Sequence, residues 1–259
     1  MLTDSHCHLG SDEIYADLDG VMARARAAGI GYVLNAGGRF DELPRQLEIC
    51  RRYNNVVTVT GVHPHDAADY EYVTTEDALK NTLLPQVAAI GECGLDYFYD
   101  FSPKDVQIKV LKKMIDAAQQ SGLPIIIHSR EAEDDTAEIL VSAYKQKPFC
   151  GVLHCYSSAW RLAEALLDIG FYVSASGIIT FKNSEELRKC FAKVPENRLL
   201  LETDSPYLAP IPLRGKINEP AFMVHTAECL AAIKGLDLNQ ISDITTNNFF
   251  KLFKKVSRV

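Results

Sequence analysis

The segment TDSHCHLG places two histidines, His6 and His8, one residue apart near the first residue of the sequence. If residues 2–8 form a strand, both imidazoles point to the same side of it together with Asp4, because side chains along a strand alternate with a period of two. Two imidazoles on one face can ligate a divalent cation. The pair is also consistent with two buried histidines that hydrogen-bond to their neighbours, so other parts of the sequence must decide between these interpretations.

Four more residues of ligand type end other short apolar runs of the sequence. They are Glu92 in AIGE, His128 in IIIH, His154 in GVLH and Asp204 in LLLETD. Charged and imidazole side chains that gather in a protein interior must be paired or must bind metal. Together with the first pair they suffice for two divalent cations about 3.5–4 Å apart, as in two-metal hydrolases. We therefore expect a two-metal centre, bridged by Glu92, that is built from His6, His8, Glu92, His128, His154 and Asp204.

Short apolar runs alternate along the chain with segments of helical period, which predicts the elements that position these residues. The expected strands are 2–8, 30–36, 56–63, 87–92, 123–128, 149–154, 171–177 and 198–204, and the expected helices include 12–28, 42–53, 103–121, 131–146, 158–169, 184–193 and the segment AFMVHTAECLAAI. Gly29, Gly122 and Gly170 stand where helices are expected to end. Eight strands alternating with helices predict a (β/α)₈ TIM barrel that forms a single domain over residues 1–259. A doubly wound open sheet is the alternative. The catalytic residues of such barrels lie at the carboxyl ends of the strands.

The composition limits the class of protein. No run of about 18 apolar residues is present to span a membrane, and the N-terminal residues lack the cationic start and apolar region of a secretory signal, so we expect a cytoplasmic protein. Seven cysteines without a C-x-x-C pair argue against disulfides and against a cysteine-rich zinc site. The net charge of −7 disfavours wrapping of long duplex DNA but allows a partner with few phosphates, such as a strand end.

Several motifs in the same order resemble those of the TatD family of metal-dependent deoxyribonucleases, within the wider superfamily of amidohydrolase-like barrels. They cover essentially the whole chain and read TDSHCHL, GVHPHDA, IGECGLDYFYDFSP, IIIHSREA, LHCYSS, LLLETDSPYLAP and LRGKINEP. The resemblance implies that one metal is held by His6, His8, Glu92 and Asp204, and the other by Glu92, His128 and His154. One departure is visible, because the family usually has Phe-Ser-Gly where Tyr156, Ser157 and Ser158 stand here.

The same resemblance implies hydrolysis of phosphodiester bonds in DNA with divalent metal ions, often from a 3′ end. Deacylation of D-aminoacyl-tRNA has also been attributed to members of the family. Paired cations lower the pKa of a shared water towards about 7. Asp204 is the expected general base, because a carboxylate that ligates through one oxygen keeps the other to accept a proton. We expect Glu202 to orient a ligating histidine, although it is equally consistent with a buried carboxylate paired with Arg or Lys.

Recognition of a phosphate requires cations or hydrogen-bond donors beside the metals. We expect His63 and His65 of GVHPHDA, Arg130, Arg214 and Asn218 to supply them, and Tyr207 to stack on a base. Two of these have alternatives, since His65 could simply end its loop at the surface and Tyr207 could only shield the site. Tyr97, Phe98 and Tyr99 form a second aromatic cluster beyond the fourth strand.

Three functions follow from these residues. The first is a metal-dependent phosphodiesterase, most simply a deoxyribonuclease that acts on DNA or RNA strand ends with two ions of Mg²⁺, Mn²⁺ or Zn²⁺. The second is cleavage of an ester or amide with the same centre, for example by a D-aminoacyl-tRNA deacylase. The third, a metal-holding protein without activity, is disfavoured by the complete ligand set. The sequence does not decide the native metal, because imidazoles favour Zn²⁺, Mn²⁺ or Fe²⁺ whereas phosphoryl transfer often uses Mg²⁺.

Overall fold

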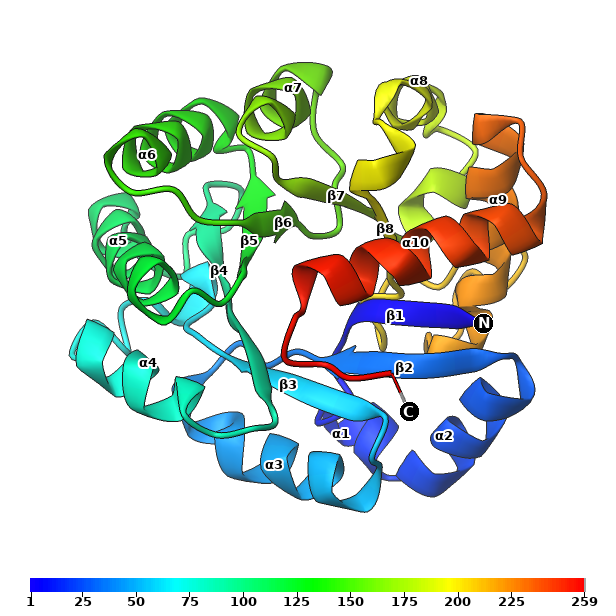
Figure 1. The fold of residues 1–259 in the computed structure, drawn as a ribbon, viewed down its shortest axis with the longest axis horizontal. Helices are drawn as coiled ribbons and strands as arrows, with labels where there is room; N and C mark the ends of the chain where they lie inside the picture. Colours follow the sequence, from blue (N-terminus) through cyan, green and yellow to red (C-terminus); the bar gives the residue numbers. More distant parts are fainter. Residues whose placement is uncertain (259) are drawn as a thin grey trace.

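Eight parallel strands form a ring with helices on its outside in the computed structural model, which describes residues 1–258 (Figure 1). The strands pair in chain order from the first to the eighth, and every pair is parallel. The predicted (β/α)₈ barrel is therefore confirmed, and the open-sheet alternative is wrong. The strands are β1 Leu2–Cys7, β2 Ile30–Asn35, β3 Val56–Thr60, β4 Val87–Asp96, β5 Ile125–Arg130, β6 Gly151–Leu153, β7 Tyr172–Ala175 and β8 Leu199–Leu201.

The helices follow the strands as the sequence predicts, with three differences. They are α1 Asp12–Tyr15, α2 Leu18–Ala27, α3 Leu43–Arg52, α4 Thr75–Thr82, α5 Lys104–Ser121, α6 Glu133–Gln146, α7 Trp160–Asp168, α8 Glu185–Lys193, α9 Met223–Lys234 and α10 Leu238–Leu252. The expected helix 12–28 is divided in two, because Asp17 has non-helical backbone angles. Helices α4 and α10 lie outside the expected ranges. Within residues 1–258, no helix combines the length and the apolar character needed to cross a membrane.

The strands that carry His6 and Glu92 are both irregular. In β1 the register shifts between Asp4 and Cys7, and in β4 it shifts between Ile90 and Cys93, so each strand has one extra residue against its partner. Such bulges re-aim side chains and are frequent beside active sites. Strand β4 also runs to Asp96, four residues beyond the expected end, since its pairing with β5 continues. This extension brings Asp96 to the same rim as Glu92.

The barrel closes between β1 and the segment after β8 through hydrogen bonds rather than a regular ladder. The backbone N–H of Asp204 donates to the carbonyl of His6 over 2.9 Å. The carboxylate of Asp4 accepts from the backbone N–H of Thr203 at 2.9 Å and from its hydroxyl at 2.6 Å. Burial raises the pKa of Asp4 to about 8. Asp4 therefore closes the barrel and is not among the side chains that line the cavity at the rim.

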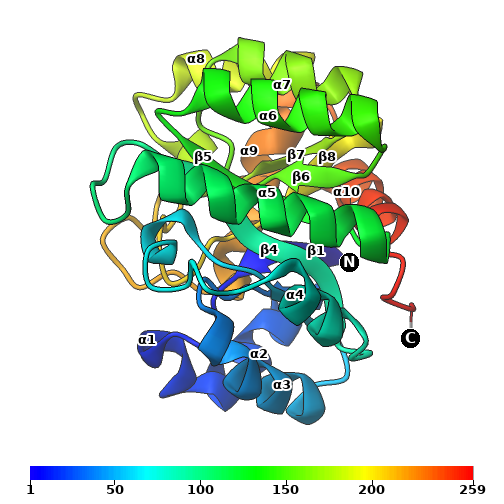
Figure 2. The same cartoon turned by 90° about the vertical axis from the view of Figure 1, so that its left-hand side faces the viewer.

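The amino end of the barrel interior is sealed by the last helix and the residues that follow it. Phe249, Leu252, Phe253 and Val256 pack against inward-facing strand residues such as Leu34, and together they form a buried apolar cluster. Helix α10 crosses this end in Figure 1, and the N-terminus lies there in Figure 2. The opposite, carboxyl end of the strands is left for polar side chains.

Phe253→Ala tests whether this seal stabilises the barrel. Phe253 is fully buried, so its truncation removes apolar burial and leaves a cavity. We expect the free energy of unfolding to fall by about 3–5 kcal/mol in urea titrations followed by circular dichroism, with EDTA present in all samples. Leu83→Ala is the control, because Leu83 is 83% exposed and its truncation should change stability by less than about 0.5 kcal/mol. Equal effects of the two substitutions would show that α10 does not seal the core.

Candidate metal centre

The carboxylate of Glu92 lies at the centre of the carboxyl-end rim, and its two oxygens face two groups of imidazoles. Its Oε2 lies 3.1 Å from Nε2 of His6 and 3.8 Å from Nε2 of His8. Its Oε1 lies 2.8 Å from Nε2 of His154 and 3.2 Å from Nδ1 of His128. The structure thus brings side chains from β1, β4, β5 and the residue following β6 to one point. This division of the two oxygens is the geometry that a bridging carboxylate requires.

Asp204 belongs to the group formed by His6 and His8. Its Oδ1 lies 3.4 Å from Nε2 of His8 and 3.9 Å from Nε2 of His6. The backbone of Asp204 has a left-handed φ of 56°, which aspartate tolerates better than most residues. This conformation turns the chain just beyond β8 and directs the carboxylate towards β1. All six residues that the sequence predicts as ligands therefore converge.

Close backbone approach at Gly94 brings β4 and β5 together beside Glu92 and His128. Gly94 has a φ of 151°, and a Cβ atom on it would lie 1.9 Å from the carbonyl oxygen of His128. No side chain fits there. The motif GECGLD therefore has its second glycine where the strand carrying the central carboxylate contacts the strand carrying His128.

The contacts of two histidines indicate which ring nitrogen would face a metal. Nε2 of His128 lies 3.1 Å from Oδ2 of Asp96 and Nδ1 lies 3.2 Å from Oε1 of Glu92. In a neutral ring that ligates a metal through Nδ1, the proton is on Nε2, where Asp96 accepts it. In His63 the arrangement is reversed, because Nδ1 accepts from the backbone N–H of His65 at 3.2 Å. The neutral ring of His63 therefore carries its proton on Nε2, which lies 3.3 Å from Oε1 of Glu92. His128 can ligate a metal on this side, whereas His63 presents a hydrogen-bond donor.

Burial and charge shift the pKa values of the centre in opposite directions. Burial alone would raise the pKa of the Glu92 carboxyl, but the neighbouring imidazoles, that of His154 first, hold it well below its usual value. Burial alone would lower the pKa of His154, but Glu92 and Glu202 raise it well above its usual value. His63 differs, since burial lowers its pKa to about 4 and keeps the ring neutral at pH 7. Positive charge is thus strongly favoured beside Glu92.

The donor atoms fit divalent cations. The two nitrogens of His6 and His8 that face Glu92 are 3.3 Å apart, and those of His128 and His154 are 3.4 Å apart. Lone pairs so close oppose one another unless a proton or a cation lies between them. Imidazole nitrogens with carboxylate oxygens suit Zn²⁺, Mn²⁺ and Fe²⁺, and the carboxylates also suit Mg²⁺.

A cavity of about 1000 Å³ opens over the centre and contains most of the predicted substrate contacts. His63, His65, Arg130 and Tyr207 line it, together with His8 and Glu92. Nε2 of His65 lies 2.7 Å from Oδ2 of Asp96, so this histidine is held by a buried carboxylate at the cavity wall.

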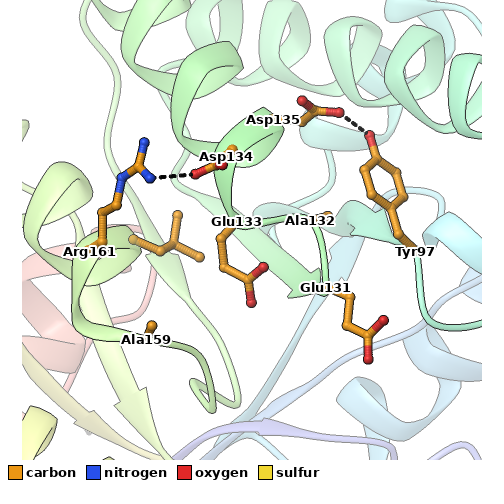
Figure 3. A pocket seen from close by; sticks show the side chains of 9 residues that line it. Tyr97, Glu131, Ala132, Glu133, Asp134, Asp135, Ala159 and Arg161 are labelled. Atoms are coloured by element: carbon orange, nitrogen blue, oxygen red, sulfur yellow. Dashed lines mark hydrogen bonds and ion pairs between the residues drawn. The ribbon is translucent and has the colours of Figure 1, made fainter.

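A second, smaller cavity of about 320 Å³ lies beside the start of α6 and is lined by four carboxylates (Figure 3). Three of them are already engaged, because Asp134 pairs with Arg161, Asp135 accepts from the hydroxyl of Tyr97 and Glu133 accepts from the hydroxyl of Ser158. None of the residues that the sequence predicts for the site lines this cavity. The chemistry therefore belongs to the larger cavity.

Two predicted substrate contacts lie elsewhere. The guanidinium of Arg214 packs over the ring of Phe181 at 3.9 Å and does not line the cavity. Asn218 is buried, and its amide donates to the carbonyls of Thr203 and Tyr207 at 2.9 and 2.6 Å. The side-chain NH₂ group of Asn218 thus donates both of its hydrogen bonds to the loop that carries Asp204. Asn218 therefore holds that loop in place and does not face the cavity.

Glu202 lies beside His154, as the sequence analysis expects of an orienting carboxylate. Its Oε1 is 3.4 Å from Nδ1 of His154 and accepts from the backbone N–H of Cys155 at 2.6 Å. Within residues 1–258, Glu202 forms no ion pair with Arg or Lys, which removes the alternative. Cys155 departs from the strand alternation, because β6 ends at Leu153 and Cys155 has a left-handed φ of 44°. Its side chain lines the cavity, whereas Cys7 and Cys93 pack in the outer core.

Asp96 is the residue of the site that sequence reasoning missed. Its Oδ2 contacts Nε2 of both His65 and His128, and its Oδ1 accepts from the backbone N–H groups of Phe98 and Tyr99 at 3.0 and 3.1 Å. Burial alone would raise the pKa of Asp96, but these hydrogen bonds, that from His128 first, lower it. Its position four residues after Glu92 in GECGLD was the available signal.

Comparison with known proteins places the chain in one family. Residues 3–254 match the model of a family described as TatD related DNase. The chain is 40% identical to the uncharacterized metal-dependent hydrolase YcfH of Escherichia coli, over 97% of this chain and 95% of that protein. It is 32% identical to the 3′-5′ ssDNA/RNA exonuclease TatD of Salmonella typhimurium, over 98% of this chain and 99% of that protein.

A solved structure agrees with the fold over its full length. The crystal structure of YJJV, a TatD homologue from Escherichia coli K12, superposes with a TM-score of 0.91 at 27% sequence identity. The match covers 98% of each chain. The barrel and the order of its elements are therefore shared along the whole chain.

Asp96→Asn tests the orienting role of this carboxylate. The amide oxygen should stay with the two backbone N–H groups, which turns the NH₂ group towards His128. An NH₂ group cannot accept from Nε2–H, so the proton of His128 moves to Nδ1 and occupies the nitrogen that faces Glu92. We expect Mn²⁺ affinity, measured by isothermal titration calorimetry, to fall about 10–100-fold. Asp116→Asn, an exposed change on α5, is the control, and equal affinities of the two variants would contradict the role of Asp96.

Proposed function

The chain belongs to the TatD family of metal-dependent hydrolases, and from this premise we propose that it hydrolyses phosphodiester bonds at the ends of DNA or RNA strands with a pair of divalent cations. The division of the two Glu92 oxygens between two groups of imidazoles carries the proposal. The relative named as a 3′-5′ ssDNA/RNA exonuclease supports the choice of substrate. The expected cytoplasmic location and the choice among Mg²⁺, Mn²⁺ and Zn²⁺ are part of the proposal.

Two sets of side chains would hold the cations. When bound, a pair of divalent cations makes water a stronger nucleophile at neutral pH and stabilises charge on the attacking and leaving oxygens. Glu202 and Asp96 orient His154 and His128 through the ring nitrogens that face away from Glu92. The first set is His6, His8, Glu92 and Asp204, and the second is Glu92, His128 and His154.

Asp204 is the proposed general base. Burial alone would raise the pKa of its carboxyl, but the hydrogen bond from His8 and the neighbouring imidazoles lower it, so the group is ionised at neutral pH. Its Oδ1 faces His8, and the other oxygen can accept a proton from the attacking water. The loop hydrogen bonds donated by Asn218 hold this carboxylate at the rim.

Donors on one side of the cavity suit a phosphate. His63 presents Nε2–H beside Glu92, and its ring stays neutral. Arg130 forms no ion pair among residues 1–258, whereas Arg39 and Arg45, which also line the cavity, are paired with Asp41 and Asp12. An arginine without a carboxylate partner, at the wall of a cavity in an acidic protein, is available to bind a phosphate bidentately.

Tyr207 lies at the other side of the centre. It is 58% exposed, lines the cavity and contacts the ring of His8 edge-on at 6.1 Å. A ring in this position can stack on a base that enters the cavity. We therefore assign Tyr207 to substrate binding, in preference to a lid.

Incubation of the purified protein with a single strand that carries a 5′ label tests the proposed function. With Mg²⁺ or Mn²⁺ we expect stepwise shortening from the 3′ end. A parallel panel of carboxylic esters and D-aminoacyl-tRNA tests the alternative, a metal-dependent ester or amide hydrolase. Cleavage of that panel without shortening of the strand, by protein shown to contain metal, would replace the proposed function with the alternative. Absence of both activities in such protein would favour the metal-holding protein.

Asp204→Asn should remove nearly all turnover on the labelled strand. The amide cannot accept the proton of the attacking water, and loss of a general base lowers the rate by about 10²–10⁴-fold. Circular dichroism should be unchanged, and metal analysis should still find at least one ion. Asp134→Asn, at an exposed ion pair beside the second cavity, is the matched control and should retain full activity. Unchanged turnover in Asp204→Asn would remove the role of Asp204 as general base.

A further inference from the structure

Three aromatic side chains form an exposed surface next to the cavity, which we call the aromatic platform: Phe98, Tyr99 and Phe101. They are 49%, 40% and 63% exposed. Exposed aromatic rings that gather at one place on a protein surface usually mark a binding site. Tyr99 is also part of the cavity wall, so the platform continues the cavity outward.

The rings of the platform are packed in a defined arrangement. Tyr99 and Phe101 are stacked, with their centroids 5.2 Å apart and an interplanar angle of 22°. Phe98 meets Tyr99 edge-on at 4.7 Å, and the guanidinium of Arg130 lies over Phe98 at 3.9 Å. The ring of His65 contacts both Tyr99 and Phe101 edge-on, at 5.3 and 4.9 Å. The platform is thus continuous with the histidines of the cavity.

One buried carboxylate links the platform to the metal centre. Oδ1 of Asp96 accepts from the backbone N–H groups of Phe98 and Tyr99, while its Oδ2 contacts His65 and His128. The separation between the platform and His128 is therefore fixed by two oxygens of a single side chain. A group that stacks on the platform is held at a set distance from the centre.

The chemistry of this surface indicates its occupant. Aromatic rings with an unpaired guanidinium beside them suit a flat apolar group attached to an anion, which is the pattern of a base joined to a phosphate. A base inside a duplex has both faces covered by its neighbours, whereas a base in an unpaired strand end presents them, which favours an unpaired base as the occupant. Resting on the proposed function, we propose that the aromatic platform stacks an unpaired nucleobase of the strand being cleaved and thereby selects single-stranded ends.

Binding to Phe101→Ala tests the platform without requiring turnover. The probe is a fluorescein-labelled strand of ten thymidines, in Ca²⁺, followed by fluorescence anisotropy. We expect the Kd to rise about 5- to 150-fold relative to the unaltered protein, the range that corresponds to lost stacking on one base. The same strand in a duplex with oligoadenylate should bind the unaltered protein more weakly than the single strand does. Tyr72→Ala, an aromatic residue 74% exposed outside the cavity, is the matched control and should not change the Kd.

A second measurement uses strands that lack one base near the 3′ end. The unaltered protein should cleave a strand with an abasic site at one of the last three positions with a KM about 5- to 150-fold higher than that for the intact strand. Phe101→Ala should lose this difference, because it no longer stacks the missing base. Retention of the difference in Phe101→Ala, or its absence in the unaltered protein, would overturn the proposal.

The remaining outcomes separate this proposal from the proposed function. Methyl p-nitrophenyl phosphate, a small phosphodiester without a nucleobase, reports hydrolysis by the unaltered protein. If neither this diester nor the strand is cleaved, the proposed function fails while the anisotropy still decides the platform. Equal Kd values for Phe101→Ala and Tyr72→Ala would overturn the platform even if cleavage is normal. A change confined to self-association, measured by analytical ultracentrifugation, would assign the surface to a contact between copies of the chain and would also overturn it.

Discussion

The structure of the rim depends on one constraint: the carboxylate of Glu92 is buried, and a buried charge must be neutralised. Desolvation of an isolated carboxylate costs far more than a folded domain can supply, so positive groups have to surround it. Imidazoles from four other parts of the barrel lie within 3.3 Å of its oxygens, and they hold its pKa well below the usual value. A pair of divalent cations satisfies the same requirement. The imidazoles that neutralise Glu92 in the folded protein are therefore the same side chains that would hold the cations.

The barrel supplies this arrangement through a few precise contacts outside the centre. Asp4 closes the ring between β1 and the residues after β8, and Asn218 holds the loop that presents Asp204. Asp96 sets the proton position of His128 and at the same time fixes the backbone at Phe98. The orientation of His128 and the position of the aromatic platform therefore both depend on the side chain of Asp96.

The sequence was sufficient to predict the barrel and the convergence of six side chains, for a simple physical reason. Parallel strands in a barrel end at the same rim, so a polar residue that closes an apolar run has a defined place. Features that depend on local backbone geometry could not be predicted in this way. The bulges in β1 and β4 and the left-handed φ of Cys155 break the alternation of side chains, and they leave no periodic signal. Asp96 lies beyond the apolar run of β4, and residue spacing does not show that the amide of Asn218 bonds to the carbonyls of Thr203 and Tyr207.

Anomalous diffraction from crystals soaked in Mn²⁺ tests the central claim most directly, because it locates each ion without reference to activity. The account predicts two peaks about 3.5–4 Å apart, on either side of the Glu92 carboxylate. One should lie beside His6, His8 and Asp204, and the other beside His128 and His154. A single peak that touches only one oxygen of Glu92, or peaks away from this residue, would contradict the account.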